Sequence, residues 1–162
     1  MLKYTDTEVT FAEVPGHITL CINISNCPCK CNECHSSYLA EDIGEPLDEQ
    51  ALDTLIKGNK GITCIAFMGG DAEPEEINRL VIYVKAHYSI KTAWYSGRDF
   101  IHPSVKVSFL DFVKIGPYRK ECGPLNKDTT NQIFYKVVHL SSGKDKLYDI
   151  TWKFWYDKSN RT

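Results

Sequence analysis

The sequence predicts an α/β protein in which most strands are parallel. Two stretches, at residues 46–58 and 74–84, carry apolar side chains at helical spacing, and short apolar stretches flank each of them. Strands that alternate with helices along a chain typically form parallel βαβ units. The chain has 162 residues, fewer than the roughly 250–300 at which chains usually divide. We therefore expect one domain over residues 1–162.

The first two expected strands precede a cysteine-rich loop. Residues 8–14 alternate apolar and polar side chains, which is typical of a half-buried strand, and Pro15 and Gly16 then turn the chain. Residues 17–24 are more apolar and predict a deeper strand. The cysteines follow directly, so the loop leaves from the C-terminal end of this second strand.

The two helices are expected where proline and glycine mark their ends. The first lies between Pro46 and Gly58, and its apolar face is Leu52, Leu55 and Ile56. A short apolar strand follows at residues 62–67. The second helix begins at Pro74, and its apolar residues share one face: Ile77, Leu80, Val81 and Val84.

The remaining apolar stretches predict four strands, at residues 90–95, 109–115, 132–139 and 147–155, the last of them rich in aromatic residues. Ligands of open α/β sheets bind beyond the C-terminal ends of parallel strands. The cysteine loop, the segment 69–71 and the segment 95–97 all follow such ends. We therefore expect these three loops to form a site at one edge of the sheet.

The composition excludes several classes of protein. Nineteen basic and twenty-one acidic residues give a net charge of −2, whereas a protein that binds nucleic acid mainly by charge usually has an excess of basic residues. The sequence contains no apolar stretch long enough to span a membrane. Its first residues lack the pattern of a signal peptide. We expect a cytoplasmic protein with no direct contact to nucleic acid or membrane.

Seven cysteines are the unusual feature of the composition, and five of them lie between Cys21 and Cys34. An odd number of cysteines in a cytoplasmic protein argues against a disulfide framework. Cys21 and Cys64 lie in expected strands, where a free cysteine packs as a small apolar residue. The loop between residues 27 and 34 instead carries several thiols close together, and such a loop can bind a metal.

The spacing favours an iron–sulfur cluster over zinc. Cys27, Cys31 and Cys34 are the triplet with offsets of four and three residues. Three thiolates on a short loop can hold three irons of a [4Fe-4S] cluster and leave the fourth iron for an exchangeable ligand. Tetrathiolate zinc sites usually take cysteine pairs from two separate loops. Zinc remains an alternative because Cys29 is an additional thiol, and a loop of free thiols is a third.

The other two loops each allow two interpretations. Gly69 and Gly70 permit close approach of the backbone to a ligand, and Asp71 could accept an ammonium group. Alternatively, the glycines form a tight turn and Asp71 caps the following helix. Ser96 either binds a ribose hydroxyl or starts a turn. His35 either ligates the metal or packs beside the site.

The assembled motifs resemble the radical S-adenosylmethionine (SAM) superfamily, whose signature is Cys-x3-Cys-x2-Cys after the first strand. More closely, the chain is similar to the activating proteins of anaerobic ribonucleoside-triphosphate reductase. The similarity runs from about residue 7 to residue 137 and rests on the segments 23–28, 34–36, 67–71, 93–97, 111–116 and 131–132. The final aromatic residues lie outside it: Trp152, Phe154 and Trp155.

The resemblance implies a partial (βα) barrel of the radical SAM type with mostly parallel strands. It implies that Cys27, Cys31 and Cys34 bind a [4Fe-4S] cluster whose open iron is chelated by SAM. The segment Gly69, Gly70 and Asp71 would receive the methionine ammonium, and Ser96 the ribose. The backbone of Glu33 and His35, on either side of Cys34, would lie against the adenine.

The resemblance also implies an activity. The enzyme would reductively cleave SAM to a 5′-deoxyadenosyl radical and generate the glycyl radical on the large catalytic subunit of anaerobic ribonucleoside-triphosphate reductase. A low-potential donor such as flavodoxin or ferredoxin would supply the electron, and no catalytic residue is expected beyond the cluster ligands. Tyr38, Trp94 and Tyr118 are candidates for a face closed by the partner, although a single aromatic residue more often packs in the core.

The sequence departs from the family pattern at three places. Glu33 stands where an aromatic residue or glycine is common, Asp71 and Ala72 replace Glu-Pro, and Cys29 is additional. The roles of Cys29, Cys122 and the aromatic C-terminal residues are unassigned. Two alternative functions remain: a radical SAM enzyme that acts on another protein or a small molecule, and a non-catalytic zinc-binding interaction module.

Overall fold

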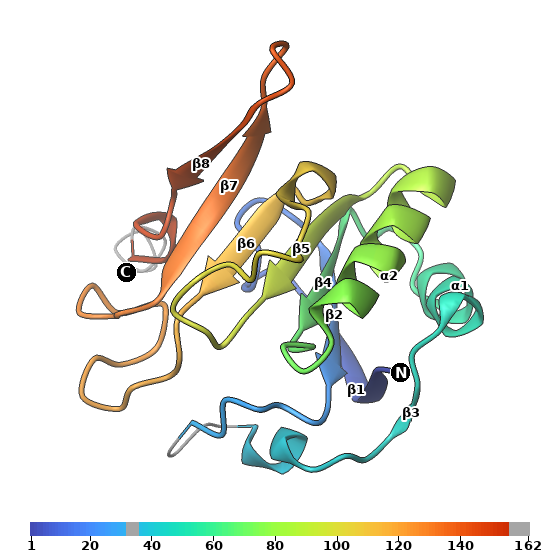
Figure 1. The fold of residues 1–162 in the computed structure, drawn as a ribbon, viewed down its shortest axis with the longest axis horizontal. Coiled ribbons are helices and arrows are strands. Elements are labelled where there is room, and N and C mark those ends of the chain that lie inside the picture. Colours follow the sequence, from blue (N-terminus) through green and yellow to red (C-terminus); the bar gives the residue numbers. More distant parts are fainter. Residues whose placement is uncertain (32–35, 156–162) are drawn as a thin grey trace.

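The computed structural model describes residues 1–31 and 36–155. Their strands form one sheet in the order β3-β1-β2-β4-β5-β6-β7-β8 (Figure 1). The strands are β1 (Lys3–Thr10), β2 (Thr19–Ile24), β3 (Glu45–Pro46), β4 (Cys64–Met68), β5 (Lys91–Tyr95), β6 (Phe112–Ile115), β7 (Ile133–His139) and β8 (Asp145–Asp149). The helices are α1 (Glu49–Gly58), α2 (Pro74–His87) and the short 3-10 helices η1 (Ser37–Ala40) and η2 (Val107–Phe109).

The direction of the strands corrects the expected fold. The central strands β2, β4, β5 and β6 are parallel, but β3, β1, β7 and β8 are all paired antiparallel, so most pairings in the described part of the chain are antiparallel. The sheet is open, with β3 and β8 at its two edges. The partial (βα) barrel with mostly parallel strands is therefore wrong.

The connections between strands explain this result. A parallel pair needs a long crossover, usually through a helix, whereas an antiparallel pair can be joined by a tight turn. The crossovers of the central strands contain α1 and α2. The β7–β8 connection is a tight turn, closed by the hydrogen bond from the Leu140 N–H to the Lys144 carbonyl at 3.0 Å. The chain therefore reverses direction at the sheet's C-terminal side instead of continuing toward a barrel.

Both expected helices are confirmed, and their termini follow from local chemistry. The Asp48 side chain accepts a hydrogen bond from the Ala51 N–H at 2.8 Å, so α1 begins at Glu49 rather than near Pro46. Helix α2 begins at Pro74, a favourable first residue because its missing N–H would be unpaired there. None of the described helices combines the length and the apolar character that crossing a membrane requires.

The sheet separates two apolar clusters. The larger one contains alternate strand residues, such as Ile22, Phe67 and Trp94, together with the apolar faces of α1 and α2. The smaller one lies on the opposite face of the sheet and contains Cys21 and Tyr95 with residues of loops and turns. Helices α1 and α2 therefore cover one face, whereas loops, turns and the helical residues 153–155 lie against the other (Figure 1).

Two strand predictions were misplaced. The first strand occupies residues 3–10 instead of 8–14, and most of its side chains are half-exposed, so the apolar pattern marks it weakly. The last strand was expected at residues 147–155 but ends at Asp149. The chain then turns, and the Phe154 ring packs edge-on against Phe134 with centroids 5.0 Å apart. Phe154 therefore serves packing rather than strand formation, whereas Trp152 is 50% exposed.

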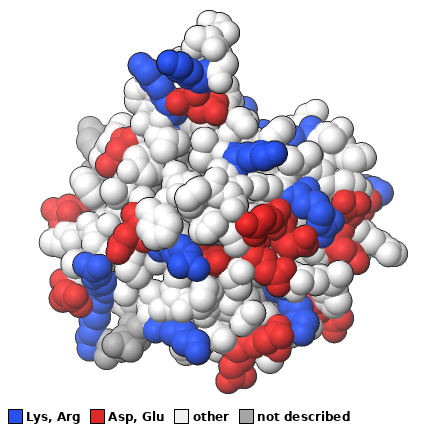
Figure 2. Space-filling model, viewed as in Figure 1, with Lys and Arg blue, Asp and Glu red and all other residues white. Residues whose placement is uncertain are grey.

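Charged side chains of both signs are interspersed on the face shown in Figure 2. Arg79 of α2 forms ion pairs with Glu76 at 2.9 Å and with Glu49 of α1 at 3.1 Å. Such surface pairs usually contribute less than about 1 kcal/mol each. The contact between the two helices therefore depends mainly on their apolar faces.

Phe67→Ala should lower the free energy of unfolding by about 3–5 kcal/mol, because the Phe67 side chain is completely buried in the larger cluster. Phe11→Ala is the matched control. Phe11 is 75% exposed, so its loss should change stability by no more than about 0.5 kcal/mol. Urea denaturation of both variants measures the difference, and equal losses would contradict this account of the core.

Candidate functional site

Three loops meet at the edge of the sheet where the central strands end. They are the cysteine loop after β2, the glycine segment after β4 and the segment after β5. The Asp71 carboxylate joins them, because it accepts hydrogen bonds from the Ser96 hydroxyl at 2.5 Å and from the Cys29 thiol at 3.7 Å. The structure therefore brings Asp71, Ser96 and the cysteine loop together, as their positions after parallel strands predict.

Backbone hydrogen bonds fix the start of the cysteine loop. The Cys27 N–H donates to the Leu39 carbonyl at 2.8 Å, and the Asn26 N–H donates to the Glu41 carbonyl at 2.9 Å. Asn26 and Lys30 have positive φ angles of 59° and 43°. This conformation is uncommon for residues other than glycine, and Asn adopts it more readily than most. The chain therefore bends sharply just before Cys27 and again just before Cys31.

Two of the expected ligands face the same space. Cys27 and Cys31 line a cavity of about 180 Å³, together with Lys30, Ser36, Ser37 and Ala40. The third expected ligand, Cys34, lies outside the described residues, as do Glu33 and His35. Within the described ranges, no group of three potential metal ligands comes together. The cavity therefore holds two of the three thiols that the spacing selects.

The thiols of Cys27 and Cys29 differ in electrostatic environment. Hydrogen bonds from the Cys29 thiol and from the backbone N–H groups of Cys29 and Lys30 lower the pKa of Cys27. The bond with Cys27, burial and the charge of Asp71 raise the pKa of Cys29. The thiolate is the form that ligates metal. Soft thiolates are the ligands that iron–sulfur clusters use, so the residues around this cavity fit such a cluster.

Cys21 and Cys64 are buried in the sheet, as expected, and burial raises the pKa of each thiol to about 12. They belong to the smaller apolar cluster. A thiol that stays protonated among apolar neighbours is chemically inert. These two cysteines therefore have a packing role.

Asp71 is a buried carboxylate, 3% exposed, with partners on both oxygens. Oδ1 accepts from the Ser96 hydroxyl and lies 4.0 Å from the Arg98 Nε, while Oδ2 accepts from the Gly97 N–H at 2.8 Å. Arg98 also donates to the Asp71 carbonyl at 3.2 Å. The side chain that precedes α2 is Glu73, and it makes no capping hydrogen bond. The alternative that Asp71 caps the helix is therefore wrong.

Gly69 and Gly70 are required by the fold itself. Their φ angles are 115° and 94°, in the region that favours glycine. A Cβ on Gly69 would lie 3.0 Å from the Ile24 carbonyl oxygen, and one on Gly70 would lie 2.6 Å from the Ile77 side chain. The glycine pair therefore lets the chain turn closely from β4 into α2, which sets the position of Asp71.

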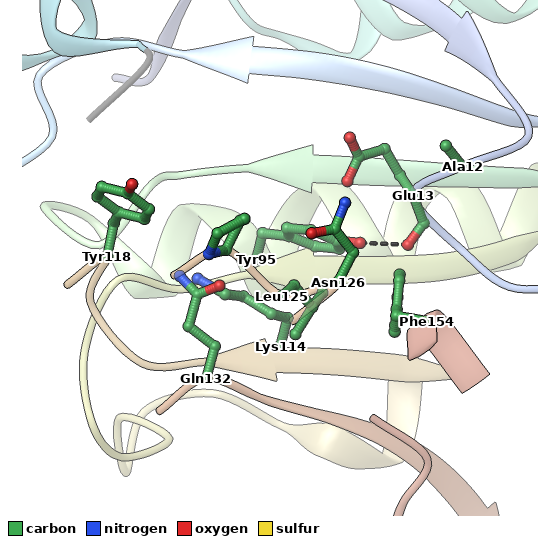
Figure 3. A pocket seen from close by; sticks show the side chains of 10 residues that line it. Ala12, Glu13, Tyr95, Lys114, Tyr118, Leu125, Asn126, Gln132 and Phe154 are labelled. Carbon is green, nitrogen blue, oxygen red and sulfur yellow. Dashed lines mark hydrogen bonds between the residues drawn. The ribbon is translucent and has the colours of Figure 1, made fainter. Parts of the chain in front are cut away.

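A second cavity of about 330 Å³ lies on the face of the sheet opposite α1 and α2 (Figure 3). Lys114 of β6 lines one side of this cavity. Its ammonium group donates to the Gly116 carbonyl at 2.8 Å and to the Ser96 carbonyl at 3.3 Å. The other lining residues are Ala12, Glu13, Tyr95, Tyr118, Pro124, Leu125, Asn126, Gln132 and Phe154. The sequence did not reveal this cavity because segments far apart in the sequence build it, from Ala12 to Phe154.

Glu13 is the acidic side chain of this second cavity. Burial is the main cause that raises the pKa of its carboxyl. The Tyr95 hydroxyl donates to the Glu13 backbone carbonyl, as the dashed line in Figure 3 shows. The proton on Glu13 is therefore held more tightly in the folded chain than in the unfolded chain.

Glu13→Gln should stabilise the protein at pH 7. A carboxyl with a raised pKa contributes stability that is fully present below its unfolded pKa and is lost as the pH rises through its folded pKa. A neutral amide avoids that loss. The advantage of the variant should therefore shrink as the pH falls from 7 to about 4, near the ordinary pKa of glutamate. Urea denaturation at both pH values measures it, and an advantage independent of pH would contradict the explanation.

Comparison with known proteins adds one finding to this geometry. A search of curated proteins and a search of solved structures each gave no match. The family described as a 4Fe-4S single cluster domain matches residues 15–133, well over half of the chain. That range includes the cysteine loop, the glycine segment and Ser96. The chain belongs to the 4Fe-4S single cluster domain family.

Proposed function

We propose that the protein reductively cleaves SAM to a 5′-deoxyadenosyl radical and generates the glycyl radical of anaerobic ribonucleoside-triphosphate reductase. One observation carries the proposal. Cys27 and Cys31, which belong to the Cys-x3-Cys-x2-Cys spacing, line one cavity in a chain of a 4Fe-4S family. This arrangement favours an iron–sulfur cluster over the zinc-binding module.

The cysteine loop would hold the cluster. Cys27 and Cys31 would supply two thiolates, and Cys34 would supply the third by its spacing. The hydrogen bonds that lower the pKa of Cys27 support its role as a ligand. When bound, the cluster would supply the single electron that cleavage of SAM requires, within the range of about −700 to +450 mV open to such clusters.

Asp71 and Ser96 support a SAM site through their position beside the cysteine loop. Both side chains are almost completely buried, and they are hydrogen-bonded to each other at 2.5 Å. SAM would therefore bind against a preformed polar pair rather than against mobile side chains. The turn at Gly69 and Gly70 would bring the backbone close to the methionine group. In this role the chain orients SAM and excludes water.

The large catalytic subunit of the reductase would bind at the same edge of the sheet. Tyr38 of η1 is 44% exposed, and Tyr118 lines the second cavity. Aromatic residues are enriched at protein interfaces. Trp94 is instead completely buried, and its indole N–H donates to the Gly69 carbonyl at 2.8 Å. A low-potential donor such as flavodoxin or ferredoxin would provide the electron.

The second cavity favours an alternative function, in which the substrate is a small molecule. Its volume of about 330 Å³ lies within the usual range for small-molecule sites, roughly 300–1,000 Å³. It borders Lys114, which contacts the Ser96 carbonyl at 3.3 Å. A small molecule seated here would lie next to the proposed SAM site. The same chemistry could therefore act on a small molecule instead of a partner protein.

Cys31→Ala should abolish assembly of the cluster, because Cys31 is one of the two thiols that line the smaller cavity. Anaerobic reconstitution with iron and sulfide, followed by measurement of both per chain, tests this expectation. Cys122→Ala removes a thiol outside that cavity and should retain the cluster. A colourless wild-type protein that binds one zinc per chain would favour the zinc module.

The reconstituted protein should convert SAM to methionine and 5′-deoxyadenosine under dithionite. Cys31→Ala should lose this activity, because the cluster that would supply the electron no longer assembles. Chromatography of the products measures it. Addition of the large reductase subunit should produce the electron paramagnetic resonance doublet of a glycyl radical. Cluster-loaded protein that leaves SAM intact would contradict the proposed activity.

A further inference from the structure

Cys29 is the thiol of the loop that the cluster does not need. It lies between Cys27 and Cys31 in sequence, but it is not among the residues that line their cavity. Its Sγ instead lies 3.7 Å from the Oδ2 of Asp71. This contact joins the cysteine loop to the segment that follows β4. Cys29 therefore contacts Asp71 as well as Cys27, and it does not line the cavity that Cys27 and Cys31 share.

Gly97 gives independent evidence for this contact. A Cβ at this position would lie 2.8 Å from the Cys29 Sγ and 3.1 Å from the Cys29 Cβ, closer than side chains tolerate. The φ angle of Gly97 is not in the left-handed region, unlike that of Gly69 or Gly70. The backbone conformation therefore does not require glycine at residue 97. Glycine is required there because Cys29 approaches so closely.

The acceptor of the contact is itself held in place. Asp71 receives the Ser96 hydroxyl and the Gly97 N–H, both from the end of β5. The Arg98 guanidinium donates a hydrogen bond to the Asp71 backbone carbonyl. The position of the Asp71 carboxylate is therefore set by the sheet and not by the cysteine loop.

We propose that Cys29 is a positioning residue, which latches the cysteine loop to Asp71 and Gly97 and thereby sets where Cys27 and Cys31 lie. The inference rests on the proposed function in one respect, that Cys27 and Cys31 ligate the cluster. Cys29 forms no bond to metal in this role. Its thiol has hydrogen-bond contacts to both the Asp71 carboxylate and the Cys27 sulfur, and its side chain fills the space that Gly97 leaves open.

The first test uses metal-free, reduced protein. The rate at which each thiol is alkylated is measured by mass spectrometry. Gly97→Ala and Asp71→Asn should each raise the rate at Cys29 about tenfold, because a hydrogen bond to a charged group contributes roughly that factor or more. Gly58→Ala and Asp99→Asn are the matched controls. A Cβ on Gly58 meets nothing within 4 Å, and Asp99 is exposed, so neither should change the rate.

The second test uses reconstituted protein, with loss of iron to a chelator and the electron paramagnetic resonance spectrum as readouts. Gly97→Ala should speed the loss of iron about tenfold and shift the spectrum. Cys29→Ala removes the Sγ that the new methyl group meets at 2.8 Å. The double variant should therefore lose iron more slowly than Gly97→Ala alone. Cys29→Ser keeps a donor and should lie between Cys29→Ala and the wild type.

Each outcome decides the proposal. If Cys29→Ala binds as little iron as Cys31→Ala, Cys29 is a ligand and the latch is wrong. If alkylation of Cys29 is equally fast in the wild type, Gly97→Ala and Asp71→Asn, the contact does not hold the loop and the latch is wrong. If the wild type binds no iron, the proposed function fails, while the alkylation rates still support or overturn the latch.

Discussion

The burial of the Asp71 carboxylate is the constraint on which the site depends. A buried carboxylate is strongly destabilising unless hydrogen bonds and positive charge compensate it. Here the compensation comes from the segment after β5 and from the cysteine loop, through Ser96, Arg98 and Cys29. The partners belong to separate parts of the chain. The carboxylate can therefore be buried when the ends of β4 and β5 are assembled together, and the Cys29 contact then adds the cysteine loop to this assembly.

The apolar pattern of the sequence predicted the helices that bury one face and the strands that are buried on both faces. Helices α1 and α2 have clear apolar faces, and β4 and β5 are almost wholly buried, so the pattern located all four closely. Strand β1 is mostly half-exposed, and Phe154 is apolar because its ring packs against Phe134 rather than because it lies in a strand. Pattern alone does not separate packing in a turn from packing in a strand.

The direction of the strands and part of the site depend on contacts between distant residues. Periodicity shows that a segment is a strand but not how its neighbour runs, so the antiparallel pairs at both sides of the sheet were not foreseen. The spacing of the cysteines selected Cys27 and Cys31 because the signal is local. The cavity between Glu13 and Lys114 carries no such signal, since it forms only when the loops fold over the sheet.

An open sheet ends in strands that have unpaired backbone groups, and β8 is such an edge. Its Leu147 and Tyr148 side chains are 39% and 49% exposed, which would favour pairing with the edge of another molecule. Charged residues interrupt the same strand, with Asp145 and Lys146 at its start and Asp149 at its end. Docking a second strand there would remove these charges from water. The edge is thereby protected against self-association and aggregation, even though it is apolar in part.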